Sequence, residues 1–216
     1  MKTMSITLLT SVLFISSITL VPLPLPVDAA TGTTVLDLDG QEVQANKKYY
    51  ILPVVRGMGG GLALGLRNKT CPFYVAQEIL EVSKGLPLRF LPVNATDKFV
   101  QVSTDMNFVF SAATICVQST AWRLGSIDEV SGRRYVTTGG RVGNPGRGTL
   151  SNWFKIESYM HDYKLVFCPS VCNFCKVMCG DVGVFVEDGK RWLGLSDVPF
   201  PIMLKKDEPN KAVSLY

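Results

Sequence analysis

The chain has 216 residues, with 22 lysines and arginines against 18 aspartates and glutamates, and a formal net charge of +4. Its basic residues are scattered, as at Lys47, Lys48, Arg89 and Arg133, and they form no stripe of the kind that binds nucleic acid. We therefore expect a solvated basic surface and no nucleic-acid partner.

Residues 1–29 have the pattern of a secretory signal peptide. Lys2 precedes an apolar stretch, and Val27 and Ala29 occupy the small-residue positions before a cleavage-like site at Ala30. Serine, threonine and a PLPLP segment interrupt the stretch, which argues against a membrane anchor, and no later segment has about 18 consecutive apolar residues. The sequence predicts a secretory-pathway protein without a membrane partner, with one domain at 30–206 and a polar tail at 207–216.

Short apolar or alternating runs, separated by glycine and proline turns, recur through the rest of the chain. No stretch of about a dozen residues keeps a helical period, apart from an ambiguous patch at 76–82. The pattern predicts an all-β protein, either a sandwich or a closed barrel. The expected strands are YYILPVV (49–55), LALGL (62–66), FYVAQEI (73–79), LRFLPV (88–93), FVQVS (99–103), NFVFSA (107–112), RRYVTTG (133–139), YKLVF (163–167) and VGVFVED (182–188).

A weak threefold rhythm accompanies these runs. Trp122, Trp153 and Trp192 each stand beside a strand-like segment. Three similar four-strand units that close on each other would form a β-trefoil, which is a further candidate architecture beside the sandwich and the simple barrel.

Six cysteines in an oxidising compartment are interpreted first as three disulfides, whose pairing the sequence alone leaves open. Four of them fall within CPSVCNFCKVMC at 168–179, a spacing that would also suit a metal or redox centre. A metal site needs reduced thiolates, and a redox site needs a Cys-x-x-Cys that opens a helix. The predicted secretory leader argues against reduced thiolates, and the β pattern argues against a helix at the Cys-x-x-Cys, so we expect neither kind of site. Asn68 and Asn94 begin acceptor sequons for N-glycosylation.

No constellation of residues indicates an enzyme. The only histidine, His161, has no nucleophile motif beside it. The glycine run at 57–61 lacks the lysine and hydroxyl residue of a phosphate loop, and we interpret it as a hairpin turn. Asp37 and Asp39 are not followed by a calcium-binding loop. We expect a binding protein with no catalytic residue, metal or cofactor.

The mature chain resembles the plant Kunitz family of the soybean trypsin inhibitor type over residues 35–205. The resemblance lies in VLDLDGQEV followed by YYI near the start, and its last third, with the four-cysteine cluster and GKRWLGLSD, is similar to the miraculin-like branch. Further matching segments are CPFYVAQ (71–77), VQVSTDMNFVFS (100–111), TAWRL (120–124), GNPG (143–146), NWFKIE (152–157), YKLVFCPSVC (163–172) and CGDVGVFV (179–186).

The resemblance implies a β-trefoil of about twelve strands with pseudo-threefold symmetry. It also implies the disulfides Cys71–Cys116, Cys168–Cys179 and Cys172–Cys175. Because this pairing leaves no thiol for a covalent dimer, we expect a monomer. Members of such a family are expected in the apoplast, outside the cell, or in the vacuole.

The resemblance further implies that the chain inhibits a serine endopeptidase through an exposed, substrate-like loop. That loop falls within Val93–Phe99. An ungapped count places Thr96 at the specificity position, which does not suit trypsin, whereas a shifted register would offer Lys98–Phe99 instead. The expected loop residues are Asn94, Ala95, Thr96, Asp97, Lys98 and Phe99.

Two features set this loop apart from the family pattern. The position of a supporting asparagine is occupied by Ala45, with Asn46 adjacent, and a glycan on Asn94 would obstruct docking. Two alternatives follow: an inhibitor of papain-type cysteine proteases that acts through another loop, or a non-inhibitory, miraculin-like trefoil with a defence, storage or ligand-binding role.

Overall fold

The computed structural model describes residues 33–67 and 69–208, so the predicted leader, Asn68 and residues 209–216 lie outside it. This part of the chain contains twelve strands and one short 3-10 helix, η1 (Arg147–Asn152), and no helix long and apolar enough to cross a membrane. The strands are β1 (Lys48–Pro53), β2 (Leu62–Gly65), β3 (Tyr74–Gln77), β4 (Leu88–Pro92), β5 (Met106–Phe110), β6 (Arg123–Ile127), β7 (Arg134–Thr137), β8 (Lys155–Tyr159), β9 (Asp162–Phe167), β10 (Gly180–Glu187), β11 (Lys190–Ser196) and β12 (Pro201–Lys206).

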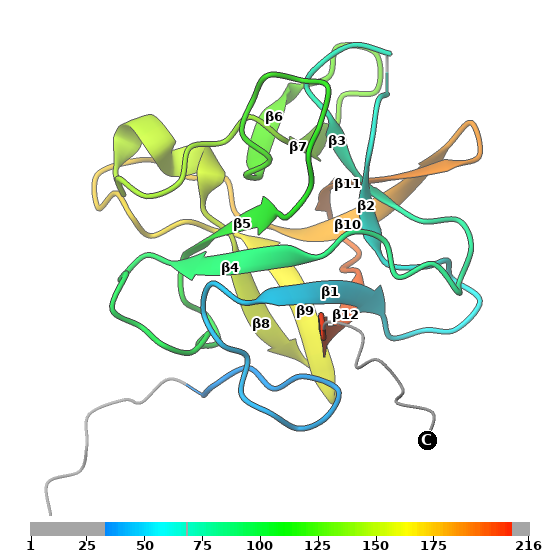
Figure 1. Ribbon diagram of the computed structural model, residues 1–216. Coiled ribbons are helices and arrows are strands. Elements are labelled where there is room, and N and C mark those ends of the chain that lie inside the picture. Colours follow the sequence, from blue (N-terminus) through cyan, green and yellow to red (C-terminus); the bar gives the residue numbers. More distant parts are fainter. Residues whose placement is uncertain (1–32, 68, 209–216) are drawn as a thin grey trace, which may run out of the picture. The chain divides into compact units, whose positions relative to one another are not determined.

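Six strands close into a barrel. β1 pairs with β4 and β12, β4 with β5, β9 with β8 and β12, and a bridge between Met106 and Phe154 joins β5 to the residue before β8. The barrel strands lie together in Figure 1, with β5 and β4 at mid-height and β1, β8, β9 and β12 below them. They are the first and fourth strands of three consecutive four-strand units.

The second and third strands of each unit form the hairpins β2–β3, β6–β7 and β10–β11. The three hairpins also pair with one another, β3 with both β7 and β11, and β7 with β11. Six barrel strands capped by three mutually paired hairpins make a β-trefoil, which confirms the fold class that the resemblance implied.

The barrel interior is filled by aromatic side chains. Phe108 stacks on Trp122, with ring centroids 4.8 Å apart, and meets Phe90 and Phe154 edge-on at 5.1 and 5.9 Å. Phe167 continues the cluster from Phe154 at 5.4 Å. These rings come from the second and third units and from β4, so the core joins all three units.

The tryptophans did not mark the threefold symmetry in the way the sequence suggested. Trp122 precedes β6 and Trp153 precedes β8, so both belong to the second unit, whereas Trp192 lies within β11 of the third. Trp122 fills the barrel, while Trp192 packs edge-on against Tyr74 in the hairpin layer. Tryptophan rings occur where the interior has space to fill, whichever unit that is. The threefold symmetry was therefore predicted correctly, but from residues that do not repeat with it.

Two local predictions were wrong. Residues 99–103 form no strand and make only isolated bridges, Phe99 to Gln44 and Gln101 to Thr34, because the partner segment turns back on itself between Leu36 and Glu42. The glycine run at 57–61 connects β1 to β2, which do not pair, and so it is no hairpin turn. Its Gly60 and Gly61 instead pack against backbone carbonyls of residues 78–84, where a side chain would collide.

The six cysteines form the three disulfides that the resemblance implied. Cys71–Cys116 joins the start of β3 to the β5–β6 connection across 45 residues, and loop closure of this length stabilises a fold by about 4 kcal/mol in the chain-entropy model. Cys172–Cys175 lies inside Cys168–Cys179, within the connection between β9 and β10. The cluster therefore staples a loop of the third unit.

A charge cluster joins the outer ends of the three hairpins. Arg67, just after β2, contacts the Asp128 carboxylate at 2.6 Å and the Glu187 carboxylate at 3.0 Å. Arg133 also contacts Glu187, at 2.6 Å, and the Tyr135 hydroxyl donates a hydrogen bond to it. Burial would raise the pKa of Glu187, but the hydrogen bonds from Tyr135, Arg133 and Arg67 outweigh it and lower that pKa.

This cluster predicts a stability loss in acid. Hydrogen bonds from the Ser131 amide and hydroxyl, and then from Arg67, lower the pKa of Asp128 from 3.8 to about 2. Because the folded-state value is depressed, the ionised carboxylate contributes its full stabilisation, on the order of 2 kcal/mol, above about pH 4 and loses it as pH falls toward 2. In urea unfolding at several pH values, the deficit of Asp128→Asn relative to wild type should therefore shrink to near zero by pH 2. Asp188→Asn, at an exposed hairpin tip, is the control, and a pH-independent deficit for Asp128→Asn would contradict the assignment.

Candidate functional site

The connection between β4 and β5, residues 93–105, begins with an exposed segment at the end of the barrel. Val93, Asn94, Ala95, Thr96 and Lys98 are exposed, and the buried Val100 marks the return of the chain to the core. The segment is the green loop that projects beyond the ends of β4 and β5 at the lower left of Figure 1. It contains every loop residue that the sequence singled out.

Both ends of this loop are fixed to the barrel. On the amino-terminal side, the Val93 amide donates to the carbonyl of Asp105 at 2.8 Å. On the carboxyl-terminal side, the Ala45 amide donates to the carbonyl of Lys98 at 2.9 Å, and Phe99 forms a bridge with Gln44. The loop is thus held in one conformation by backbone contacts before any partner binds.

The tip of the loop is a tight turn organised by Asn94. Its side-chain Oδ1 accepts hydrogen bonds from the Thr96 amide at 3.3 Å and from the Thr96 hydroxyl at 2.8 Å. Its Nδ2 donates to Asp97 Oδ1 at 2.7 Å, and its carbonyl accepts from the Asp97 amide at 3.1 Å. These bonds close a tight turn over residues 94–97, in which Asn94, Ala95 and Thr96 are exposed and Asp97 is half-buried.

The two registers that the sequence left open differ in the hydrogen bonding of their carbonyl groups. A serine protease must take the scissile carbonyl oxygen into its oxyanion hole. The carbonyl of Lys98 already accepts the Ala45 amide, whereas the carbonyl of Thr96 accepts no hydrogen bond from any residue in 33–67 or 69–208. Of the two candidate bonds, only Thr96–Asp97 has a carbonyl group without a hydrogen bond to another described residue.

The segment before β1 supports the carboxyl-terminal end of the loop through a backbone group and not through an asparagine side chain. Ala45, which stands at the position of the supporting asparagine, contributes its amide. The adjacent Asn46 has a left-handed backbone with φ of 60°, and its Oδ1 accepts a hydrogen bond from Arg89 Nη1 at 3.0 Å. Its side chain is thus directed at β4 and away from the loop tip.

Asp105 was not singled out in the sequence, and it fixes the other side of the loop. The residue is 5% exposed, and its carboxylate accepts hydrogen bonds from the amide and hydroxyl of Ser170, while its carbonyl holds Val93. Ser170 belongs to the disulfide-stapled connection, so Asp105 ties the loop base to the cysteine cluster. The sequence offered no signal for this, since the two residues lie far apart in the chain.

Asn94 is exposed, as a glycosylation site must be, while Asn68 lies outside the described residues. A glycan on Nδ2 would leave that nitrogen a single hydrogen for its bond to Asp97. Glycosylation would also place a bulky group two residues before Thr96.

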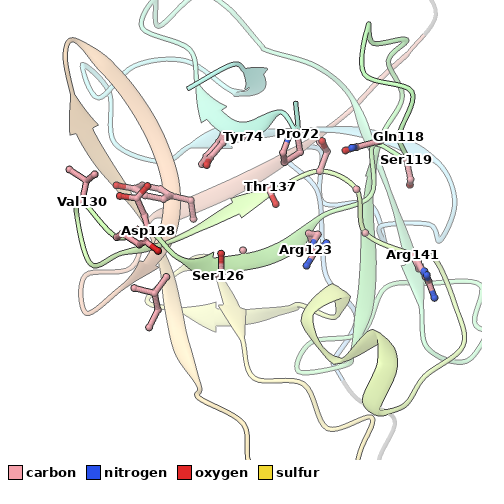
Figure 2. Close-up of a pocket in the computed structure, with 17 residues that line it drawn as sticks. Pro72, Tyr74, Gln118, Ser119, Arg123, Ser126, Asp128, Val130, Thr137 and Arg141 are labelled. Atoms are coloured by element: carbon pink, nitrogen blue, oxygen red, sulfur yellow. The ribbon is translucent and has the colours of Figure 1, made fainter. Parts of the chain in front are cut away.

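A separate groove of about 860 Å³ runs along the β6–β7 hairpin, far along the chain from the loop. Figure 2 shows its labelled side chains spread along the groove, with Asp128 and Val130 at one end and Gln118, Ser119 and Arg141 at the other. Its volume is in the range of small-molecule sites. The polar groups do not gather at one point, so the groove suits an elongated ligand better than a compact one.

Comparison with known proteins gives consistent matches over the described domain. The family model of legume Kunitz proteins, described as trypsin and protease inhibitors, matches residues 35–206. Kunitz trypsin inhibitor 5 of Arabidopsis thaliana is 49% identical over 80% of this chain and 85% of its own length, and miraculin of Synsepalum dulcificum is 47% identical over 80% and 82%. A solved Kunitz-type cysteine protease inhibitor from potato is 33% identical, with a TM-score of 0.72, over 83% of this chain and 100% of that chain.

Proposed function

Because the chain belongs to the Kunitz family of trypsin and protease inhibitors, we propose that it inhibits a serine endopeptidase by presenting the Thr96–Asp97 bond. The proposal gives the chain no catalytic role of its own. We also propose that the chain is a secretory-pathway protein, which the predicted leader and the three disulfides support. We propose further that it is a monomer, since all six cysteines pair within the chain.

The observation that carries this proposal is the loop at 93–99, which is exposed at its tip and pinned at both ends. A loop already held in one conformation loses little conformational entropy when a protease binds it. Pinning by Val93 and Lys98, together with the Asn94 turn, supplies this pre-organisation. It also explains how a loop without a supporting asparagine remains ordered.

Thr96 indicates the kind of protease. A trypsin-like pocket carries an aspartate that pairs with lysine or arginine, whereas elastase-type enzymes have a small pocket. The short, neutral side chain of Thr96 suits the small pocket. We therefore assign the target to endopeptidases that cleave after small residues.

A titration of unglycosylated protein against an elastase, subtilisin, trypsin, chymotrypsin and papain tests the assignment. We expect the tightest inhibition for an enzyme with a small specificity pocket. Thr96→Glu should weaken that inhibition by at least about 100-fold, because it brings a carboxylate into a pocket built for a short neutral group.

Thr70→Glu, the same change at an exposed threonine outside the loop, is the matched control and should have no effect. Equal inhibition by wild type and Thr96→Glu would show that another surface docks. Inhibition of papain alone would indicate instead an inhibitor of cysteine proteases, like its potato relative.

A ligand-binding role is the second candidate, and the groove along β6–β7 is the observation that favours it. The chain shares 47% identity with miraculin, a relative not named as an inhibitor. Absence of inhibition in all five titrations would favour this role, which assigns the binding surface to the groove near Tyr74 and Arg141 and not to the loop.

A further inference from the structure

A second concave site, apart from the loop tip and the β6–β7 groove, gathers basic side chains. It lies where the segment before β1 meets β4 and the end of β12, and its volume is about 610 Å³. Four cations and one carboxylate surround it, so its local charge is strongly positive although the chain as a whole carries only +4. The lining residues are Gln44, Asn46, Lys47, Lys48, Arg89, Lys206 and Asp207.

The strand pairing forces two of these cations together. Lys48 of β1 stands directly opposite Arg89 of β4 in the antiparallel register. Directly opposed side chains lie on the same face of a sheet about 5 Å apart, and like charges in that position destabilise the pair. This charge arrangement would be relieved by an anion between the two side chains.

The four cations of the cleft form no ion pair with a carboxylate of the described residues. None of Lys47, Lys48, Arg89 and Lys206 lies within ion-pair distance of a carboxylate in the described residues. The one acidic residue of the site, Asp207, accepts a hydrogen bond from the Tyr50 hydroxyl through its carboxylate. The positive charge of the cleft is thus available to a ligand.

Arg89 is the most firmly positioned of the four. Its side chain is half-buried, and Asn46 Oδ1 accepts from its Nη1 at 3.0 Å. Asn46 is itself held by its amide, which donates to the Phe90 carbonyl at 2.8 Å, in a left-handed conformation that few residues other than glycine adopt readily. A guanidinium oriented in this way offers its remaining N–H groups as a planar fork, the geometry that carboxylate, sulfate and phosphate groups accept.

We propose that this cleft binds a small polyanion, a molecule with two or more closely spaced carboxylate, sulfate or phosphate groups. The hollow suits a small ligand better than the convex surface of a protein, and four cations contributed by three segments suit several negative groups better than one. Arg89 and Lys48 bind one group between them, and Lys47 and Lys206 bind the next. This site stands independently of the protease-inhibition proposal.

Calorimetric titration of the full mature protein at low ionic strength tests the proposal. Trigalacturonate, sucrose octasulfate and tripolyphosphate serve as carboxylate, sulfate and phosphate probes and so distinguish the source of the anionic groups. We expect saturable 1:1 binding of at least one probe that weakens as salt is added. The triple variant Lys48→Gln, Arg89→Gln, Lys206→Gln should weaken it by at least about 50-fold, since each ion-pair contact near the surface contributes about a fivefold effect.

The matched control removes the same three charges from exposed positions elsewhere, Arg56→Gln, Lys176→Gln and Lys190→Gln, and should retain binding within about threefold. Equal losses in the two triple variants would show attraction by net charge alone and would overturn the site. Absence of saturable binding for all three probes would overturn it as well. The Lys48 and Arg89 side chains point away from the core. The unfolding temperatures of both triple variants should therefore match that of the wild type, so that a loss of binding can be assigned to the cleft and not to unfolding.

Discussion

Replacing Thr96 by lysine is expected to convert the protein into a trypsin inhibitor, lowering its dissociation constant for trypsin by at least about 1,000-fold. The lysine would occupy the position from which the side chain enters the specificity pocket, where an aspartate pairs with it. The turn should survive, because the Asn94 carbonyl and Nδ2 still hold Asp97 when the Thr96 hydroxyl is lost. Inhibition of trypsin by the unglycosylated Thr96→Lys protein is the measurement.

Two controls give this experiment its meaning. Thr70→Lys makes the same change on an exposed surface away from the loop and should give no inhibition. Adding Lys98→Ala to Thr96→Lys should leave inhibition unchanged, because in the Thr96–Asp97 register the Lys98 side chain does not enter the specificity pocket, and its carbonyl still accepts the Ala45 amide. If instead the added Lys98→Ala abolishes trypsin inhibition, the Lys98–Phe99 register is correct and our assignment of the bond is wrong.

The largest loss of stability is expected from Phe108→Ala, which should reduce the free energy of unfolding by about 3 to 5 kcal/mol. Phe108 is fully buried and touches the rings of Phe90, Trp122 and Phe154. Its removal opens a cavity at the point where aromatic side chains from β4, β5 and the segments before β6 and β8 meet. A barrel closed by strand pairing has little freedom to collapse into that cavity. Urea unfolding at neutral pH with disulfides intact measures the loss.

Phe174→Ala is the matched control for this prediction. Phe174 lies between Cys172 and Cys175 and is 82% exposed, so the same substitution there should change the free energy of unfolding by less than about 0.5 kcal/mol. Losses of similar size for the two variants would mean that the barrel interior does not carry the stability that its packing indicates.

The strand pattern predicted most of the sheet but not the way it closes. Runs such as 62–66 and 107–112 became β2 and β5 because short apolar runs bounded by turn residues are a local property of the chain. The closing strand β12, PIMLKK, begins with proline and ends in two lysines, and it pairs with β1 and β9 to complete the barrel. Closure depends on partners about 40 and 150 residues away, which a local pattern does not contain.

The candidate loop was located from the sequence, whereas its geometry was not. Residues 93–99 were predicted from the resemblance, and the structure places them together in an exposed, pinned segment. The choice between Thr96–Asp97 and Lys98–Phe99 rests on one backbone hydrogen bond from Ala45. Any residue can donate this bond, so the amino-acid sequence does not reveal it. The basic cleft shows the same limit, because Lys48 and Arg89 lie far apart in the sequence and only the pairing of β1 with β4 places them opposite each other.

The position of the first disulfide has a consequence for what happens when a protease cuts the loop. Cys71 precedes the Thr96–Asp97 bond in the chain and Cys116 follows it, so hydrolysis of that bond produces two chain segments that remain one covalent molecule. The Val93 and Lys98 contacts also keep the new carboxyl and amino termini near each other. If a protease cuts this bond, its resynthesis would be a unimolecular reaction at high effective concentration, and the nicked and intact forms would be two interconverting states of one molecule.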